Sequence, residues 1–353
     1  MLTVVSVAFP LAPVGPDAVG GAEQVLWQLD AALTAAGHRS VVVACEGSRV
    51  AGTLVSFPAP TGPLDDAARA AARAGCRQAL DRALRRWSAD LVHMHGLDFD
   101  AYLPDPGVPV LATLHLPPEW YAPRVFRLER PDTWLQCVSA SQHERCPPAA
   151  RLLPPIENGV PLDRFGARVS RRGFALALGR ICPEKGFHHA LDAATRAGVP
   201  LLLGGVVFGY EAHERYFREA IVPRLDARHR FIGPVSARRK RRLLAAARCV
   251  VIPSLVPETS SLVAIEALAS GTPVVAHPAG ALAGIVDHGR TGFLVHDEAE
   301  MADAIAAAPG IDPAACRAAA RERHSAERMS AEYLELYRRV AGSGGVPAAL
   351  RAE

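Results

Sequence analysis

The chain has 353 residues, half of them hydrophobic, and a formal net charge of +3. That length and composition are sufficient for two α/β domains with complete cores. The small charge argues against a general polyanion binder, so we expect no nucleic-acid partner. No apolar run approaches the ~18 residues of a membrane span, so we expect no transmembrane segment.

Seven cysteines are scattered along the chain without a C-x-x-C motif. This odd, scattered set fits a reducing compartment and argues against a zinc site. The apolar N-terminal run lacks the positive n-region of a signal peptide, because no lysine or arginine precedes Arg39. We therefore predict a cytoplasmic protein that begins with a strand.

The first strand is predicted over residues 2–8, and a loop rich in proline and glycine then leads to an amphipathic helix over 22–36. Gly20 and Gly21 precede this helix. Paired glycines at a helix start allow a phosphate to approach the backbone closely, and a flexible turn is the alternative. Glu46, after a second strand, stands where a dinucleotide fold places its ribose-binding acid. The G-x-G-x-x-G spacing is absent, which disfavours that interpretation.

Histidines follow the next predicted strands, after a long helix over 65–87. His93 and His95 lie on one face of a strand over 90–96, because side chains alternate along a strand. With Asp98 and Asp100 they match a metal-ligand pattern, but we favour the simpler interpretation that they line the carboxyl edge of the sheet.

The composition turns polar over residues 166–172, where we place the domain boundary. A strand over 174–178 then leads into a glycine-bounded loop that carries Arg180 and Lys185. The chain has only two lysines, and Lys185 is one of them. The densest basic run, 238–242, has no interleaved aromatic residues, so we interpret it as a solvated helix face rather than a nucleic-acid site.

The stretch 253–275 organises the second half as strand, loop, helix and strand. Hydroxyl side chains at residues 259–261 predict the start of the helix, and Gly271 predicts its end. Glu266 is the only charged residue between Thr259 and Val286, on a helix that is otherwise aliphatic and small. A buried carboxylate needs donors. An arginine from a neighbouring element and the hydroxyls of a nucleotide ribose are the two candidates.

The pair Glu258 and Glu266, with the segment 267–275 that follows, resembles the glutamate-pair signature of the retaining glycosyltransferases of family 4. The resemblance extends over segments 112–115, 157–165, 179–186, 230–235 and 289–295. It implies the GT-B fold, an α/β architecture of two Rossmann-like domains whose parallel sheets face each other across a cleft. The C-terminal helix would cross back to the first domain. One departure is that residues 259–261 read Thr-Ser-Ser, where the family commonly has Pro-Phe-Gly.

The resemblance also implies roles for individual residues. Glu258 would meet the donor sugar, Glu266 the ribose, and the two cations the diphosphate. The implied catalytic residues are His115, Arg180, Lys185 and Glu258. The implied donor-binding residues are Gly21, Arg180, Lys185, Val235, Glu258, Thr259, Ser260, Ser261, Leu262 and Glu266. The implied acceptor-side residues are Gly20, Glu23 and His95.

We therefore predict an acceptor domain over 1–168, a nucleotide-sugar domain over 169–322, a crossing helix over 323–341 and a disordered tail over 342–353. The expected reaction transfers a hexose, glucose, from a UDP-sugar to an acceptor hydroxyl with retention. No cofactor or metal is expected beyond the donor. The expected acceptor is a small molecule, a glycan or a lipid. For the oligomeric state, both a monomer and a homodimer remain as alternatives. A GT-B sugar epimerase or phosphorylase and a non-catalytic nucleotide-sugar-binding protein are the alternatives.

Overall fold

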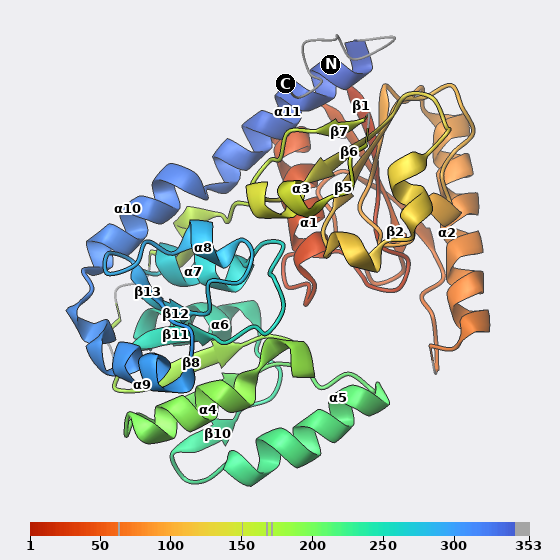
Figure 1. Ribbon diagram of the computed structural model, residues 1–353. Coiled ribbons are helices and arrows are strands. Elements are labelled where there is room, and N and C mark those ends of the chain that lie inside the picture. Colours follow the sequence, from red (N-terminus) through yellow and green to blue (C-terminus); the bar gives the residue numbers. More distant parts are fainter. Residues whose placement is uncertain (63, 150, 167–168, 171, 343–353) are drawn as a thin grey trace. The chain divides into compact units, whose positions relative to one another are not determined.

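The computed structural model describes residues 1–62, 64–149, 151–166, 169–170 and 172–342. The chain divides into two compact units (Figure 1). Unit 1 comprises Met1–Asn158 and Glu327–Glu353, and unit 2 comprises Gly159–Ala326. The tail predicted from residue 342 lies outside the described residues from 343 onward.

Unit 1 is built on a parallel seven-stranded sheet in the order β3-β2-β1-β4-β5-β6-β7. The strands are β1 Thr3–Val7, β2 Arg39–Cys45, β3 Thr53–Phe57, β4 Leu91–Met94, β5 Val110–Leu114, β6 Thr133–Cys137 and β7 Leu152–Leu153. The helices are α1 Gly21–Ala35, α2 Asp66–Arg86, α3 Ala140–Arg145 and α11 Ala326–Gly342, with short η1 Phe99–Ala101, η2 Pro118–Trp120 and η3 Pro123–Arg127.

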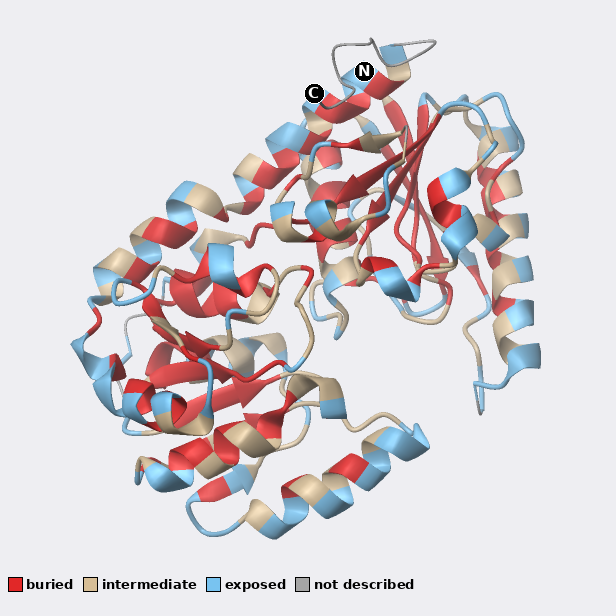
Figure 2. Cartoon of the chain, in the orientation of Figure 1, coloured by how far each residue is buried: buried red, intermediate tan, exposed pale blue. Residues whose placement is uncertain are grey.

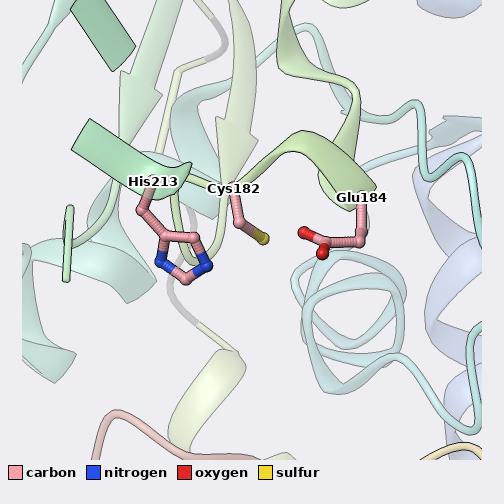
Figure 3. A group of neighbouring side chains, drawn as sticks. All are labelled: Cys182, Glu184 and His213. Atoms are coloured by element: carbon pink, nitrogen blue, oxygen red, sulfur yellow. The ribbon is translucent and has the colours of Figure 1, made fainter. Parts of the chain in front are cut away.

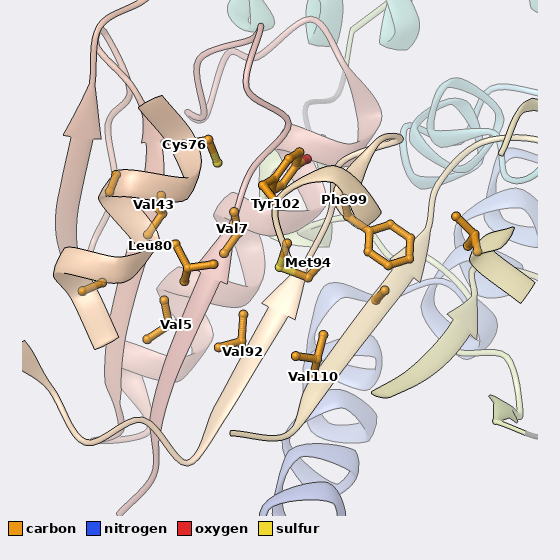
Figure 4. Packing of buried hydrophobic residues seen from close by; sticks show 14 of the residues in the cluster. Val5, Val7, Val43, Cys76, Leu80, Val92, Met94, Phe99, Tyr102 and Val110 are labelled. Carbon is orange, nitrogen blue, oxygen red and sulfur yellow. The ribbon is translucent and has the colours of Figure 1, made fainter. Parts of the chain in front are cut away.

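Alternation along the strands gives this sheet two apolar faces, as a sheet covered by helices on both sides requires. Val5 and Val7 pack with Leu80 of α2 (Figure 4). Val4, from the opposite face of the same strand, packs with helices α1 and α11. The C-terminal helix therefore completes the core of unit 1, and its buried residues recur along one face (Figure 2).

Unit 2 repeats the arrangement with six parallel strands in the order β10-β9-β8-β11-β12-β13. The strands are β8 Ala175–Leu178, β9 Leu201–Gly204, β10 His229–Phe231, β11 Cys249–Ile252, β12 Val274–Ala276 and β13 Gly292–Leu294. The helices are α4 Phe187–Arg196, α5 Glu211–Tyr216, α6 Ala237–Ala246, α7 Leu262–Ala269, α8 Leu282–Ile285, α9 Glu298–Ala307 and α10 Pro313–Arg323. Shorter helical segments are η4 Leu162–Phe165, η5 Pro183–Lys185, the π-helical η6 Phe217–Ile221, η7 Val222–Arg224 and η8 Ala308–Gly310.

The strand order reverses direction between β8 and β11 in unit 2 and between β1 and β4 in unit 1. Ligands of doubly wound sheets bind at such a switch point, outside the carboxyl ends of the strands. The loops after β8 and β11 carry most of the predicted donor residues of unit 2. The loops after β1, β4 and β5 carry the glycine pair and the histidines of unit 1.

Two boundaries differ from the sequence prediction. The units divide after Asn158 rather than after residue 168, because Val160 and Phe165 already pack in the core of unit 2. The last helix begins at Ala326 rather than at residue 323. His324 and Ser325 leave the helix because Val160 pairs with this stretch: its N–H donates to the His324 carbonyl at 2.9 Å.

None of the helices that the structure describes combines the length and apolar composition needed to cross a membrane.

Candidate active site

Two loops meet at the switch point of unit 2, one after β8 and one after β11. The N–H of Leu255 donates to the carbonyl of Glu184 at 2.8 Å. Gly186 has φ 60°, and a Cβ on it would lie 2.3 Å from the carbonyl oxygen of Pro253. A glycine is therefore required here, because it adopts the left-handed backbone and leaves room for the facing strand end.

Lys185 and Glu258, one from each of these loops, form an ion pair with Nζ and Oε1 2.5 Å apart. The Ser254 hydroxyl also donates to this carboxylate. The backbone around Glu258 is fixed as well, since the Ala281 N–H donates to its carbonyl at 2.8 Å. The Glu258 side chain is 11% exposed and that of Lys185 24%, so a ligand in solution can reach both groups.

Glu266 lies on the buried face of α7 and pairs with Lys240 of α6. The residue is only 3% exposed, and its Oε2 is buried without a hydrogen-bond partner among the described residues. Burial raises the pKa of this carboxyl group, while the charge and hydrogen bond of Lys240 lower it. One oxygen of a buried carboxylate is therefore left for a ligand that brings its own donor.

The start of α7 adds backbone donors beside this carboxylate. Ser261 is the N-cap and accepts from the Ala264 N–H at 3.4 Å, and Leu262 is the first helical residue. Thr259 is buried and Ser260 half-buried on the approach. The first N–H groups of a helix have no partner within it and suit anionic oxygens.

The remaining donor candidates of unit 2 lie on neighbouring loops. The Arg180 guanidinium makes no hydrogen bond or ion pair with another described residue, although its charge acts on Cys182 and Glu184, so its N–H groups are available to an anion. Val235, after Gly233 in the loop that follows β10, is half-buried against the core of unit 2.

Buried His93 and His95 and half-buried His115 form a network at the carboxyl ends of β4 and β5. His95 Nδ1 lies 2.9 Å from His115 Nε2, and these two rings stack with centroids 5.2 Å apart. The His93 and His95 rings are tilted by 46°, with centroids 3.9 Å apart. His93 Nε2 lies 2.7 Å from the Thr113 hydroxyl, and its Nδ1 lies 2.7 Å from that of Tyr337 on α11.

The Thr113 hydroxyl also donates to Gln136 Oε1 at 3.1 Å, an arrangement that favours the His93 tautomer with its proton on Nε2. Burial lowers the pKa of all three histidines, which keeps the rings neutral near pH 7. His95 Nε2 is buried and has no partner among the described residues.

Gly20 and Glu23 lie together at the start of α1, where Gly21 is the first helical residue. Glu23 is 5% exposed, and a Cβ on Gly20 would lie 1.8 Å from its carboxylate. Burial raises the pKa of this carboxyl group. The Glu23 side chain therefore lies against the backbone at the start of its own helix, α1.

The histidine and aspartate metal pattern of the sequence does not assemble. Asp98 pairs with Arg73 and Asp100 with Arg124, while His93 bonds hydroxyl groups. Across the part of the chain that the structure describes, these residues are not among the groups arranged to hold a metal ion.

Two family models match the chain in succession. Residues 19–164 match "Glycosyltransferase Family 4", and residues 173–308 match "Glycosyl transferases group 1". The chain belongs to the family 4 glycosyltransferases.

Two proteins with similar sequences agree with this family membership. A D-inositol 3-phosphate glycosyltransferase from Nocardioides sp. is 35% identical over 219 residues, which cover 53% of this chain and 47% of that protein. A glycogen synthase from Mycobacterium tuberculosis is 28% identical, and the match covers 90% of this chain and 88% of that protein.

Solved structures show the same fold. AviGT4, a glycosyltransferase involved in avilamycin A biosynthesis, has a TM-score of 0.73 at 25% identity, covering 98% of this chain and 99% of that one. A sucrose-phosphate synthase from Thermosynechococcus elongatus has a TM-score of 0.77 at 21% identity, covering 97% and 100%. The predicted GT-B fold of two parallel-sheet α/β domains is therefore confirmed.

One residue of this glycosyltransferase's candidate site was missed in the sequence. The basic run 238–242 was interpreted as a solvated face, yet Lys240 is 19% exposed and pairs with Glu266. That interpretation is wrong for Lys240. The signal was present, because the chain's two lysines are the partners of its two signature glutamates.

Proposed function

We propose that this glycosyltransferase transfers glucose from UDP-glucose to an acceptor hydroxyl with retention of anomeric configuration. The observation that carries the proposal is the pair of glutamates with their lysines. Glu258 and Glu266 are both held within unit 2, and one carboxylate oxygen of Glu266 has no partner among the described residues. A ribose supplies hydroxyl donors to Glu266, and a hexose beyond the diphosphate reaches toward Glu258.

The diphosphate would be bound by Arg180, Lys185 and the backbone N–H groups at the start of α7. Breaking the glycosidic bond adds charge to the leaving diphosphate, and fixed cations stabilise that charge without reorganisation. The Lys185 ammonium donates a hydrogen bond to the Glu258 carboxylate. An arriving phosphate would share this ammonium and leave the Glu258 carboxylate beside the sugar.

The sugar develops oxocarbenium character as the bond breaks, which a fixed carboxylate stabilises whether or not it bonds the sugar. In the proposed front-face route the leaving phosphate accepts the acceptor's proton. His115 would contact the donor sugar from unit 1 in neutral form, since burial lowers its pKa. His95 Nε2, Glu23 and Gly20 would face the acceptor.

Known relatives support the choice of donor. A structural neighbour from Anabaena, 20% identical with a TM-score of 0.73, was crystallised in complex with UDP-glucose. What it shares with this chain is the fold.

All seven cysteines are free thiols, which supports a reducing compartment such as the cytoplasm.

Product analysis tests the proposal. The protein is incubated with UDP-glucose, ADP-glucose or GDP-mannose and a panel of polyol, sugar-phosphate and glycan acceptors. Nucleotide release and product anomers are then followed by mass spectrometry and NMR. We expect UDP release that depends on an acceptor, and an α-linked product. Donor consumption without any acceptor would favour an epimerase or phosphorylase, and binding without turnover would favour a sensor.

The same assay with EDTA tests the proposed metal independence. Because Arg180, Lys185 and the α7 N-terminus already neutralise the diphosphate, we expect turnover to survive chelation. Complete loss of activity that Mn²⁺ restores would contradict this part of the proposal.

A further inference from the structure

Cys182, Glu184 and His213 form a cluster that the proposed reaction does not use (Figure 3). Their ligand atoms all lie within 4.8 Å of one another, and no other group of this kind occurs within the described ranges. Cys182 and Glu184 flank Pro183 at the start of η5, and His213 is on α5. Figure 3 shows the thiol between the carboxylate and the edge of the imidazole ring.

Two members of the cluster, Cys182 and His213, contact neighbouring groups. Cys182 is 2% exposed, and its thiol donates a weak hydrogen bond to the Arg180 carbonyl at 3.6 Å. The His213 ring packs edge-to-face on Tyr210, with centroids 5.1 Å apart. His213 Nδ1 is buried with no hydrogen-bond partner among the described residues, so no protein group fixes the tautomer of this ring.

This combination of ligand types is selective. A thiolate, an imidazole and a carboxylate are the donors that Zn²⁺ takes, at about 2.0–2.3 Å, whereas Mg²⁺ and Ca²⁺ prefer oxygen alone. Tetrahedral geometry with such bonds requires the ligand atoms to lie about 3.5 Å apart. Inward movements of about 1 Å would close the site. Glu184 and His213 are only half-buried, which gives the ion a path from solvent.

We propose that Cys182, Glu184 and His213 bind a zinc ion with three protein ligands and one open position. The ion would tie α5 to the loop between β8 and α4, which also carries Arg180 and Lys185. It would restrain that loop without taking part in bond breaking, so turnover in EDTA stays expected. Binding releases the Cys182 proton to solvent, since the thiolate is the metal ligand. The proposal does not depend on the donor or the acceptor.

Cobalt spectroscopy on the full-length protein tests the site without any enzyme assay. After chelator treatment, the protein is titrated with Co²⁺ in the absence of nucleotide. We expect one equivalent to give a thiolate-to-cobalt charge-transfer band and the visible bands of a tetrahedral ion, and Zn²⁺ to displace both. The Cys182→Ser variant should lose the charge-transfer band. His213→Gln and Glu184→Gln should weaken binding by at least the roughly 10–100-fold that loss of an outer-shell partner costs.

Cys146→Ser is the matched control, because the Cys146 thiol lies 3.4 Å from the Cys137 thiol, so this pair is a second place where sulfur atoms lie close together. It should bind cobalt as the wild type does. Circular dichroism establishes that each variant is folded. Absence of a charge-transfer band in the wild type would overturn the proposal. So would a band that survives Cys182→Ser or disappears in Cys146→Ser.

Discussion

Replacing Lys240 by methionine should destabilise unit 2 and leave unit 1 unchanged. The change keeps most of the side chain's apolar stem but leaves Glu266, 3% exposed, with neither oxygen paired. Two unit charges about 4 Å apart contribute about 4 kcal/mol at an effective dielectric constant of about 20. Lys240 retains 19% exposure, so solvent screens part of this. We expect a loss of about 2–3 kcal/mol in the free energy of unfolding near pH 8.

The loss should shrink as the pH falls. Burial already raises the folded-state pKa of Glu266 above its unfolded value, and removal of Lys240 raises it further. When the pKa of a carboxyl group is higher in the folded state than in the unfolded state, the native state binds more protons between these two pKa values. The free energy of unfolding therefore falls as the pH rises through that range. As the pH falls, the Glu266 carboxyl group of the variant takes up its proton before that of the wild type does, so the difference in stability between them narrows.

Urea unfolding at pH 5 and pH 8 measures both effects. All four tryptophans belong to unit 1, so fluorescence reports that unit alone, while far-UV circular dichroism reports both. The control is Arg242→Met, an exposed residue on the same helix. An equal loss in Arg242→Met, or a loss in Lys240→Met that does not depend on pH, would refute the reasoning.

Three further outcomes are expected. The fluorescence-detected stability of unit 1 should fall below pH 6.5 by up to about 1.4 kcal/mol per pH unit for each of His93, His95 and His115, whose lowered pKa values make the unfolded state bind more protons. The prediction would be wrong if a variant lacking one of these histidines lost stability as steeply below pH 6.5 as the wild type does. Arg180→Ala and Lys185→Ala should each remove about 2–4 kcal/mol of transition-state stabilisation, seen as a fall in kcat with a smaller change in KM. A rise in KM without a fall in kcat would mean that the two side chains bind only the ground state. Gly205→Ala should lower the thermal midpoint, because its Cβ would lie 1.8 Å from the Gly179 carbonyl oxygen, whereas Gly284→Ala meets open space and should not.

Structural features that depend only on residues close together in the sequence were predicted correctly. Ser261 caps α7 by bonding an N–H three residues on, and Gly271 ends the segment with φ 76°. Both depend on backbone geometry within a few residues, so residue type alone predicts them. The parallel sheets follow from strands that alternate with helices.

Features set by distant residues were not predicted. The ion pair of Lys240 with Glu266 joins two helices separated in sequence, and a run of basic residues carries no mark of which one faces inward. The break before α11 is similar, because it depends on pairing between Val160 and Ser325. An apolar pattern at helical spacing predicts that a helix exists far better than where it begins.

Calorimetric titration with UDP tests the central claim, that Glu266 binds the ribose and Glu258 the sugar. Hydrogen bonds to a charged group contribute about 1.5–3 kcal/mol, so Glu266→Ala should weaken UDP binding by about tenfold or more. Glu258→Ala should bind UDP as the wild type does while its turnover of UDP-glucose falls. Unchanged UDP affinity in a folded Glu266→Ala variant would contradict the assignment of the donor site.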